Sequence, residues 1–118
     1  MDSNRFGERG EALAAAYLEG RGWTVLDRNW RFHHKEIDLV VERGGVVAFV
    51  EVKARTAGAW DGALGAITAR KRRDLAIAAR GWIVSRGRGY ATFRFDAVTV
   101  SRCRTRLRVE HIEDAWRL

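Results

Sequence analysis

Two stretches of the chain repeat their apolar residues with the period of an α-helix. Residues 5–20 form the first, and the glycines at positions 20 and 22 predict its end. Residues 69–86 form the second, and Thr68 before them has the side chain of a typical N-cap. The apolar stripes comprise Leu13, Ala14, Tyr17 and Leu18 in the first stretch and Leu75, Ala78, Ala79, Trp82 and Ile83 in the second. We therefore predict two amphipathic helices, each with one face to bury.

Other stretches of the chain read as β-strands, with apolar residues in runs or at every second position. They are residues 23–32, the two halves of the hairpin 36–55, residues 90–100 and, as an edge strand, residues 106–112. Between the hairpin and the second helix, residues 54–67 are rich in glycine and predict an irregular connection. The order α-β-β-β-α-β-β predicts one layered α/β domain over residues 1–118.

Composition adds a cellular setting and a class of partner to this picture. Cys103 is the only cysteine, and no apolar run could span a bilayer or form a signal peptide, so we expect a cytoplasmic protein with no membrane partner. The net charge of +7 favours polyanions, and nucleic acid first among them. Only three of the 22 basic residues are lysines. A GC-rich genome would explain that ratio, but it would not explain the net charge.

The hairpin "EIDLVVERGGVVAFVEVKAR" is strongly hydrophobic, yet it carries charges near its open end. If Gly44 and Gly45 form a two-residue turn, the residues that face each other have numbers that add to 89. That register places Asp38 opposite Glu51 and, two residues on, Glu36 opposite Lys53. Directly opposed residues share a face and have Cβ atoms about 5 Å apart. The register therefore predicts one patch of four ionisable groups.

Two opposed carboxylates are unfavourable in a sheet unless a cation lies between them. Mg²⁺ prefers carboxylate oxygens and keeps water ligands, and Lys53 could hold an attacking water or stabilise charge on a phosphoryl group. Asp38, Glu51 and Lys53 around a metal would make a site for phosphodiester hydrolysis. The alternative is a solvated polar face with an ordinary Glu–Lys pair.

These residues match a known pattern. Asp38, then twelve residues, then Glu51-Val52-Lys53 resembles the D…ExK motif of the restriction-endonuclease-like nuclease superfamily. More narrowly, the chain resembles the YraN-like family of small bacterial proteins, which are related to archaeal Holliday-junction resolvases. The resemblance covers nearly the whole chain through, in order, "GERGEALAAAYLEGRGW", "LDRNWR", "EIDLV", "FVEVKAR", "TARKRRDLAIAARGWI" and "RFDAV".

The resemblance implies a restriction-endonuclease-like fold, with a mixed central β-sheet flanked by helices, and Mg²⁺ or Mn²⁺ as cofactor. It assigns Asp38 and Glu51 as metal ligands, the carbonyl of Val52 as a further ligand, and Lys53 as the catalytic lysine. It also places the first-helix glutamate of the resolvases at Glu11.

Glu11 has independent support, because it lies at the edge of the first apolar stripe and could lean over the sheet. An ordinary exposed helix glutamate is the alternative for Glu11, and Glu8 is a second candidate for the role. Lys35 stands where this family usually has glycine, and it could add a phosphate contact. Asp96 is expected to pair with a neighbouring arginine.

Basic residues around the proposed site and at the start of the second helix are candidates for contacts with nucleic-acid phosphates. They are Arg28, Arg31, Lys35, Arg55, Arg70, Lys71, Arg72 and Arg73. The resemblance implies DNA as the partner, with branched DNA as one form of it. It also raises the possibility of a homodimer, because a junction needs paired cuts.

The function expected from these observations is a Mg²⁺- or Mn²⁺-dependent endonuclease that hydrolyses DNA phosphodiester bonds, with junctions or other branched structures among its candidate substrates. The first alternative is a non-catalytic nucleic-acid-binding module that retains the nuclease fold. The second is an interaction protein whose basic face docks an acidic partner. Sensitivity of DNA cleavage and binding to a chelator would separate the three.

Overall fold

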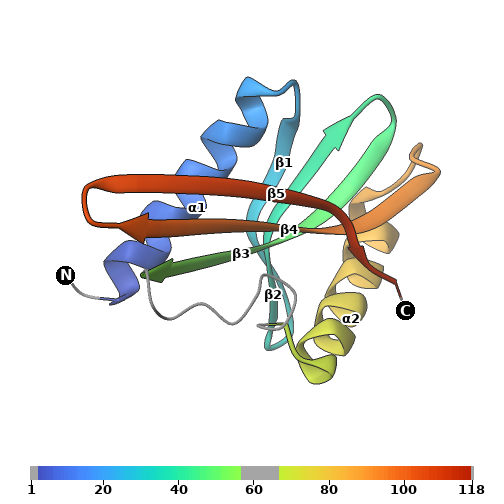
Figure 1. Cartoon of the computed structure of the whole chain (residues 1–118). Helices are drawn as coiled ribbons and strands as arrows, with labels where there is room; N and C mark the ends of the chain where they lie inside the picture. The colour runs from blue at the N-terminus through green and yellow to red at the C-terminus, as the bar shows by residue number, and fades with distance from the viewer. Residues whose placement is uncertain (1–2, 57–66, 118) are drawn as a thin grey trace.

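A computed structural model of the chain describes residues 3–56 and 67–117, and within them two helices flank a mixed β-sheet of five strands (Figure 1). The elements are α1 (Ser3–Gly20), β1 (Thr24–Phe32), β2 (Lys35–Arg43), β3 (Val46–Thr56), α2 (Ala69–Arg86), β4 (Thr92–Cys103) and β5 (Arg106–Trp116). The predicted element order and the predicted α/β class are thus confirmed. Neither described helix is both long and apolar enough to cross a membrane.

The strands lie in the order β1-β2-β3-β4-β5, so each strand pairs with its neighbours in sequence. β3 and β4 are parallel, since α2 carries the chain back between them, and the other pairs are antiparallel. Gly44 and Gly45 both have positive φ, at 60° and 84°, which is the backbone of a tight two-residue hairpin turn. β5 lies at one edge of the sheet, as predicted.

The core lies on both faces of the sheet, because a helix covers each face. Val47 and Phe49 of β3 pack in the cluster under α2, whereas Ala48 and Val50 pack in the cluster under α1. A strand covered on both sides needs apolar residues at every position. This explains why the hairpin is so hydrophobic in sequence.

The helices fall where the sequence predicts them, while the last three strands are longer than predicted. Thr68 caps α2, where its Oγ1 accepts a hydrogen bond of 3.1 Å from the backbone nitrogen of Lys71. β3 runs to Thr56, because its parallel pairing with β4 continues that far. The prediction of an irregular segment from residue 54 is therefore wrong at its start. Its central part, residues 57–66, lies outside the described residues.

Gly10 brings α1 close to β3. A Cβ atom at position 10 would lie 2.8 Å from the Cβ of Ala54, a separation that requires the helix to move. We expect Gly10→Ala to lower the free energy of unfolding by about 1–3 kcal/mol. Gly7→Ala in the same helix is the control, since its added Cβ would meet nothing within 4 Å.

Gly7→Ala is expected to be neutral or to stabilise by up to about 1 kcal/mol through helix propensity. Urea unfolding of both variants, followed by circular dichroism, measures the difference. Equal stability of the two variants would contradict the close packing of α1 on β3.

Candidate active site at the separation of β2 and β3

The candidate site forms where β2 and β3 part. Their backbone pairing runs from Arg43 and Val46 to Leu39 and Val50, which confirms the register predicted from the two-glycine turn. Beyond Leu39, a side-chain contact replaces the backbone pairing: Oδ2 of Asp38 accepts a hydrogen bond of 2.8 Å from the backbone nitrogen of Val52. Asp38 thus occupies the point of separation.

The predicted pairings of Asp38 with Glu51 and of Glu36 with Lys53 do not form: the β2–β3 pairing ends at Leu39 and Val50, and Glu51 pairs with Ala97 of β4. Glu36 pairs with Arg31 of β1, while Lys53 pairs with Thr99 of β4. The reason is that β2 follows β1 and β3 follows β4 after the two strands separate (Figure 1). The separation opens the end of the sheet, so that side chains from α1 can reach it.

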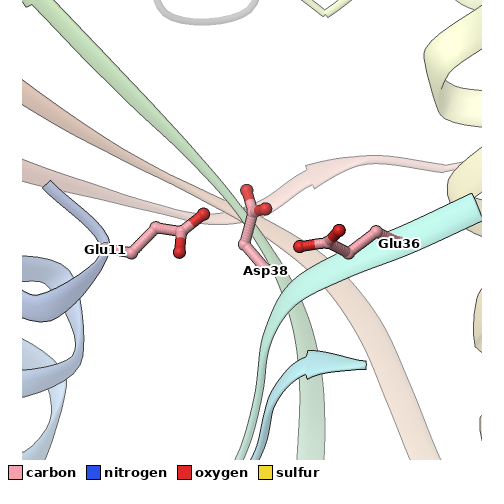
Figure 2. Close-up of side chains that lie close together, drawn as sticks. All are labelled: Glu11, Glu36 and Asp38. Carbon is pink, nitrogen blue, oxygen red and sulfur yellow. The ribbon is translucent and has the colours of Figure 1, made fainter. Parts of the chain in front are cut away.

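Three carboxylates converge at this opening. Glu11 comes from α1, and Glu36 and Asp38 come from β2; Figure 2 shows the three groups turned toward one another. One oxygen from each lies within 4.8 Å of the others, close enough for all three to bind a single metal ion. Glu11 therefore lies in the site, as the helical pattern and the resemblance both predicted. Glu36 joins as an acidic member that was not among the expected ligands.

Asn29 of β1 connects two of these carboxylates. With its amide nitrogen turned toward them, it donates hydrogen bonds to Glu11 Oε2 at 3.0 Å and to Glu36 Oε1 at 2.8 Å. Its φ of 49° is in the left-handed region, which asparagine tolerates better than most residues. Asn29 was not predicted as a site residue, because a lone asparagine in a strand carries no recognisable pattern.

Glu51 of β3 is a fourth carboxylate near the opening. It interacts with Asp38 but lies outside the group of three, and only 3% of its surface is exposed. Its Oε1 lies 3.5 Å from Lys53 Nζ and 3.7 Å from Lys71 Nζ. Its Oε2 is buried and has no hydrogen-bond partner among the described residues. A buried carboxylate oxygen without a partner is costly, which makes it a candidate ligand for a cation.

Two pKa values reflect this crowding. Burial first, and then the negative charge of Asp38, raise the pKa of Glu51 from 4.5 to about 7, although Lys71 and Lys53 oppose the shift. Burial also raises the pKa of Glu11 to about 7, with further contributions from Asp38 and Glu36. Near neutral pH the cluster therefore binds protons that a cation could replace.

Several of the predicted phosphate contacts are occupied within the fold. The ion pairs are Arg28 with Glu19 at 3.7 Å, Arg31 with Glu36 at 3.3 Å, and Lys71 with Glu51 at 3.7 Å. Lys71 thus lies at the site itself. The pairs of Arg28 and Arg31 are exposed and would exchange readily for phosphate.

The remaining basic candidates differ in their surroundings. Arg70 and Arg73 are exposed near the N-terminus of α2, and Lys35 is half-buried at the start of β2. Arg72 donates a hydrogen bond of 3.2 Å to the carbonyl of Ile67, so it supports the start of the helix. Arg55 is half-buried on β3, two residues beyond Lys53.

Asp96 of β4 is fully buried in a separate network. Arg94 donates two hydrogen bonds to it, at 3.0 and 3.2 Å, and the backbone nitrogen of Asp114 donates a third at 2.9 Å. His111 Nε2 lies 2.7 Å from its Oδ2. The expected pairing with a neighbouring arginine is confirmed, and these contacts give Asp96 a structural role.

The fold and the site define a class: a small α/β protein in which carboxylates from α1, β2 and β3 meet where two strands of a mixed sheet separate. The chain belongs to the UPF0102 family, which is the YraN-like family that the sequence resembles. The family model described as "Uncharacterised protein family UPF0102" matches residues 10–100, a range that includes all four carboxylates and Lys53.

Individual relatives support the same assignment along nearly the whole chain. The UPF0102 protein of Anaeromyxobacter dehalogenans is 43% identical over 110 residues, which cover 93% of this chain and 82% of the relative. That of Chlorobaculum parvum is 36% identical over 116 residues, covering 93% and 90%. That of Geobacter metallireducens is 35% identical over 118 residues, covering 100% and 97%.

Proposed function

We propose that this protein is a Mg²⁺- or Mn²⁺-dependent endonuclease that hydrolyses phosphodiester bonds in DNA, with branched or junction DNA among its substrates. The observation that carries the proposal is the buried Glu51, with one oxygen unpartnered, next to Asp38 and a lysine. The resemblance of Asp38 and Glu51-Val52-Lys53 to the D…ExK motif supports the same reading, and we propose on that basis that the chain is a member of the restriction-endonuclease-like superfamily. We propose that it acts in the cytoplasm as a single domain.

The residues present fit a hard divalent cation. All the side-chain donors are carboxylate oxygens, which Mg²⁺ and Mn²⁺ prefer, and burial together with the negative charge of Asp38 raises the pKa of two of them, Glu11 and Glu51. Asp38 and Glu51 would hold the ion, with the Val52 carbonyl as a further ligand and Glu11 and Glu36 beside them. A bound ion supplies polarisation of the scissile phosphate and lowers the pKa of a water ligand.

The chain's own groups would do the rest of the chemistry. Glu51 holds the Lys53 ammonium group at 3.5 Å, where Lys53 would stabilise negative charge that develops on the phosphoryl oxygens or orient the attacking water. Glu11, with a pKa of about 7, can hold or release a proton near neutral pH. The exposed Arg70 and Arg73 would bind the DNA backbone.

One observation favours a second candidate function, that of a non-catalytic nucleic-acid-binding module. Lys53 and Lys71 both lie within 4 Å of Glu51, so the site already holds two positive charges that partly compensate the buried carboxylate without a metal. Such a module would bind DNA with a steep salt dependence that neither a chelator nor Asp38→Asn would change.

A panel of end-labelled linear, nicked, flapped and four-way DNAs tests the proposal. We expect cleavage of at least one substrate in Mg²⁺ or Mn²⁺, and none in EDTA. If no substrate is cleaved in either metal while DNA still binds equally in EDTA, the nuclease proposal is wrong and the binding module stands.

A further inference from the structure

The hairpin of β4 and β5 carries a set of arginines that the candidate site does not use. Its sequence "RCRTRLR", residues 102–108, has an arginine at every second position. The hairpin runs toward the same end of the molecule as the C-terminal end of β3, because β3 and β4 are parallel (Figure 1). Its arginines therefore lie beyond the site on the same side of the fold.

Three of these arginines are exposed and are not held by the protein. Arg104, Arg106 and Arg108 have no ion pair or hydrogen bond from their side chains to any residue in the described parts of the chain. Other arginines are paired with carboxylates, as in Arg86 with Asp27 and Arg117 with Asp114. A group of like charges without partners repels itself and gains from a polyanion.

The backbone conformation at the hairpin tip is a second feature of this hairpin. Arg104 has φ 55°, a left-handed conformation that costs a residue with a Cβ about 1–2 kcal/mol relative to the right-handed region. Glycine or asparagine would be more stable at this position. The tip therefore carries an arginine where glycine or asparagine would be more stable, just as the turn between β1 and β2 carries His33.

The strand register relates the hairpin to the site. Lys53 pairs with Thr99, which pairs with Glu110, and the neighbouring row on the same face joins Arg55, Ser101 and Arg108. Because directly opposed residues share a face, Arg108 and Arg106 project from the same face of the sheet as Lys53. Arg106 and Arg108 can thus face the same ligand as Lys53, whereas Arg104 at the tip borders a pocket with Arg9 and Leu13 of α1.

The distance between them sets the length of that ligand. Arg104 lies five residues beyond Thr99, the partner of Lys53, so the tip is roughly 17 Å along the sheet from Lys53 at about 3.3 Å per residue. Duplex DNA rises about 3.4 Å per base pair, so this distance corresponds to about five base pairs.

We propose that the β4–β5 hairpin is a second DNA-binding element, which holds the phosphates of a duplex arm about five base pairs from the bond to be cut. This inference rests on the proposed action on DNA and adds to it the class of substrate. The substrate must have continuous duplex for at least about five base pairs on one side of the cleavage point. A two-stranded ribbon of this kind can also enter a groove of the duplex.

Binding measured in EDTA tests the proposal without any need for catalysis. Fluorescence anisotropy compares the wild type with the triple variant Arg104→Gln, Arg106→Gln, Arg108→Gln. The control is Arg21→Gln, Arg80→Gln, Arg88→Gln, which removes the same charge from exposed positions outside the hairpin. Each lost phosphate contact lowers the slope of log K against log salt by about 0.9.

We expect the hairpin variant to lose about 2–3 from that slope and to bind a duplex about 10–100-fold more weakly near 0.1 M salt. The control variant should lose less than threefold. In a flapped substrate, the duplex on either side of the flap can be shortened below about five base pairs. Shortening one side should remove the difference in affinity between wild type and hairpin variant, whereas shortening the other side should not.

Cys103 gives an independent readout, because it is the chain's only cysteine and is exposed beside the hairpin tip. Duplex DNA should slow its alkylation by a maleimide several-fold, whereas an equal concentration of single-stranded DNA shorter than five nucleotides should not. If the wild type binds DNA but the hairpin variant matches the control and Cys103 stays unprotected, the hairpin proposal is wrong while the nuclease proposal stands. If the wild type binds no DNA in EDTA and cleaves none in Mg²⁺ or Mn²⁺, both proposals are wrong.

Discussion

Glu51→Gln and Lys53→Met are each expected to lower metal-dependent DNA cleavage by about 10²–10³-fold, the loss typical of a removed group that stabilises transition-state charge. Glu51→Gln removes a negative charge from the proposed metal ligands, and Lys53→Met removes the ammonium group that lies 3.5 Å from Glu51. Both replacements are close in size to the original side chains, so the fold should remain. Single-turnover cleavage measures the chemical step, and circular dichroism checks the fold.

Stability provides an internal check on Glu51→Gln. Because the Glu51 carboxylate is buried and one of its oxygens lacks a partner, the neutral amide should raise the free energy of unfolding by about 1–3 kcal/mol at pH 8 in EDTA. Loss of activity together with a gain in stability is the pattern of a strained functional residue. Loss of both would mean that Glu51 is a structural residue.

Lys71→Met is the matched control for Lys53→Met, since Lys71 Nζ lies 3.7 Å from the same Glu51 oxygen but extends from α2. We expect it to weaken DNA binding modestly and to slow cleavage less than tenfold. Equal losses from the two lysine variants would show that either lysine acts only by neutralising Glu51. A Lys53→Met variant with wild-type activity would contradict the catalytic role of Lys53.

In EDTA, the protein should lose stability as the pH rises from about 5 to about 8. Folding raises the pKa values of Glu51 and Glu11 from 4.5 to about 7, so the folded state binds protons more tightly than the unfolded state. Stability linked to those protons is present below pH 4.5 and is lost as the pH passes through 7. For the buried Glu51 this amounts to on the order of 3 kcal/mol.

Mn²⁺ should reverse this loss, because a bound cation replaces the protons. We expect Mn²⁺ at about 1 mM to raise the melting temperature more at pH 8 than at pH 5.5. Glu51→Gln should flatten the pH dependence, whereas Glu110→Gln, on the exposed edge strand, should leave it unchanged. Melting temperatures that do not vary with pH in EDTA would contradict the crowding of these carboxylates.

Local signals made the helices and the tight turn predictable. The stripe of α2 and its Thr68 cap belong to one continuous helical segment, and the two glycines of the turn are adjacent. The ends of β3 and β4 were not predictable in this way, because the two strands lengthen each other through parallel pairing up to Thr56 and Arg102. That pairing depends on how α2 returns the chain.

The candidate site was predictable only where local patterns determine it. Counting from the turn predicted that Asp38 lies near Glu51, and the two carboxyl groups do interact, although the backbone pairing ends one residue earlier, at Leu39 and Val50. The contributions of Glu36 and Asn29 depend on β2 leaving β3 to follow β1, and that of Lys71 depends on how α2 packs. No short-range pattern encodes these arrangements, so the sequence did not predict what Glu36, Asn29 and Lys71 contribute to the site.

The carboxylates where β2 and β3 separate are expected to bind a divalent cation, on which the proposed function depends. Calorimetric titration of Mn²⁺ into the wild type and into Asp38→Asn tests this expectation directly, because the asparagine oxygen can still accept the hydrogen bond from Val52 that Asp38 accepts at 2.8 Å. We expect saturable binding with release of protons at pH 7 in the wild type, and binding at least about tenfold weaker in the variant, equivalent to about 1.4 kcal/mol. Identical titrations of the two proteins, or no saturable binding by the wild type, would contradict it.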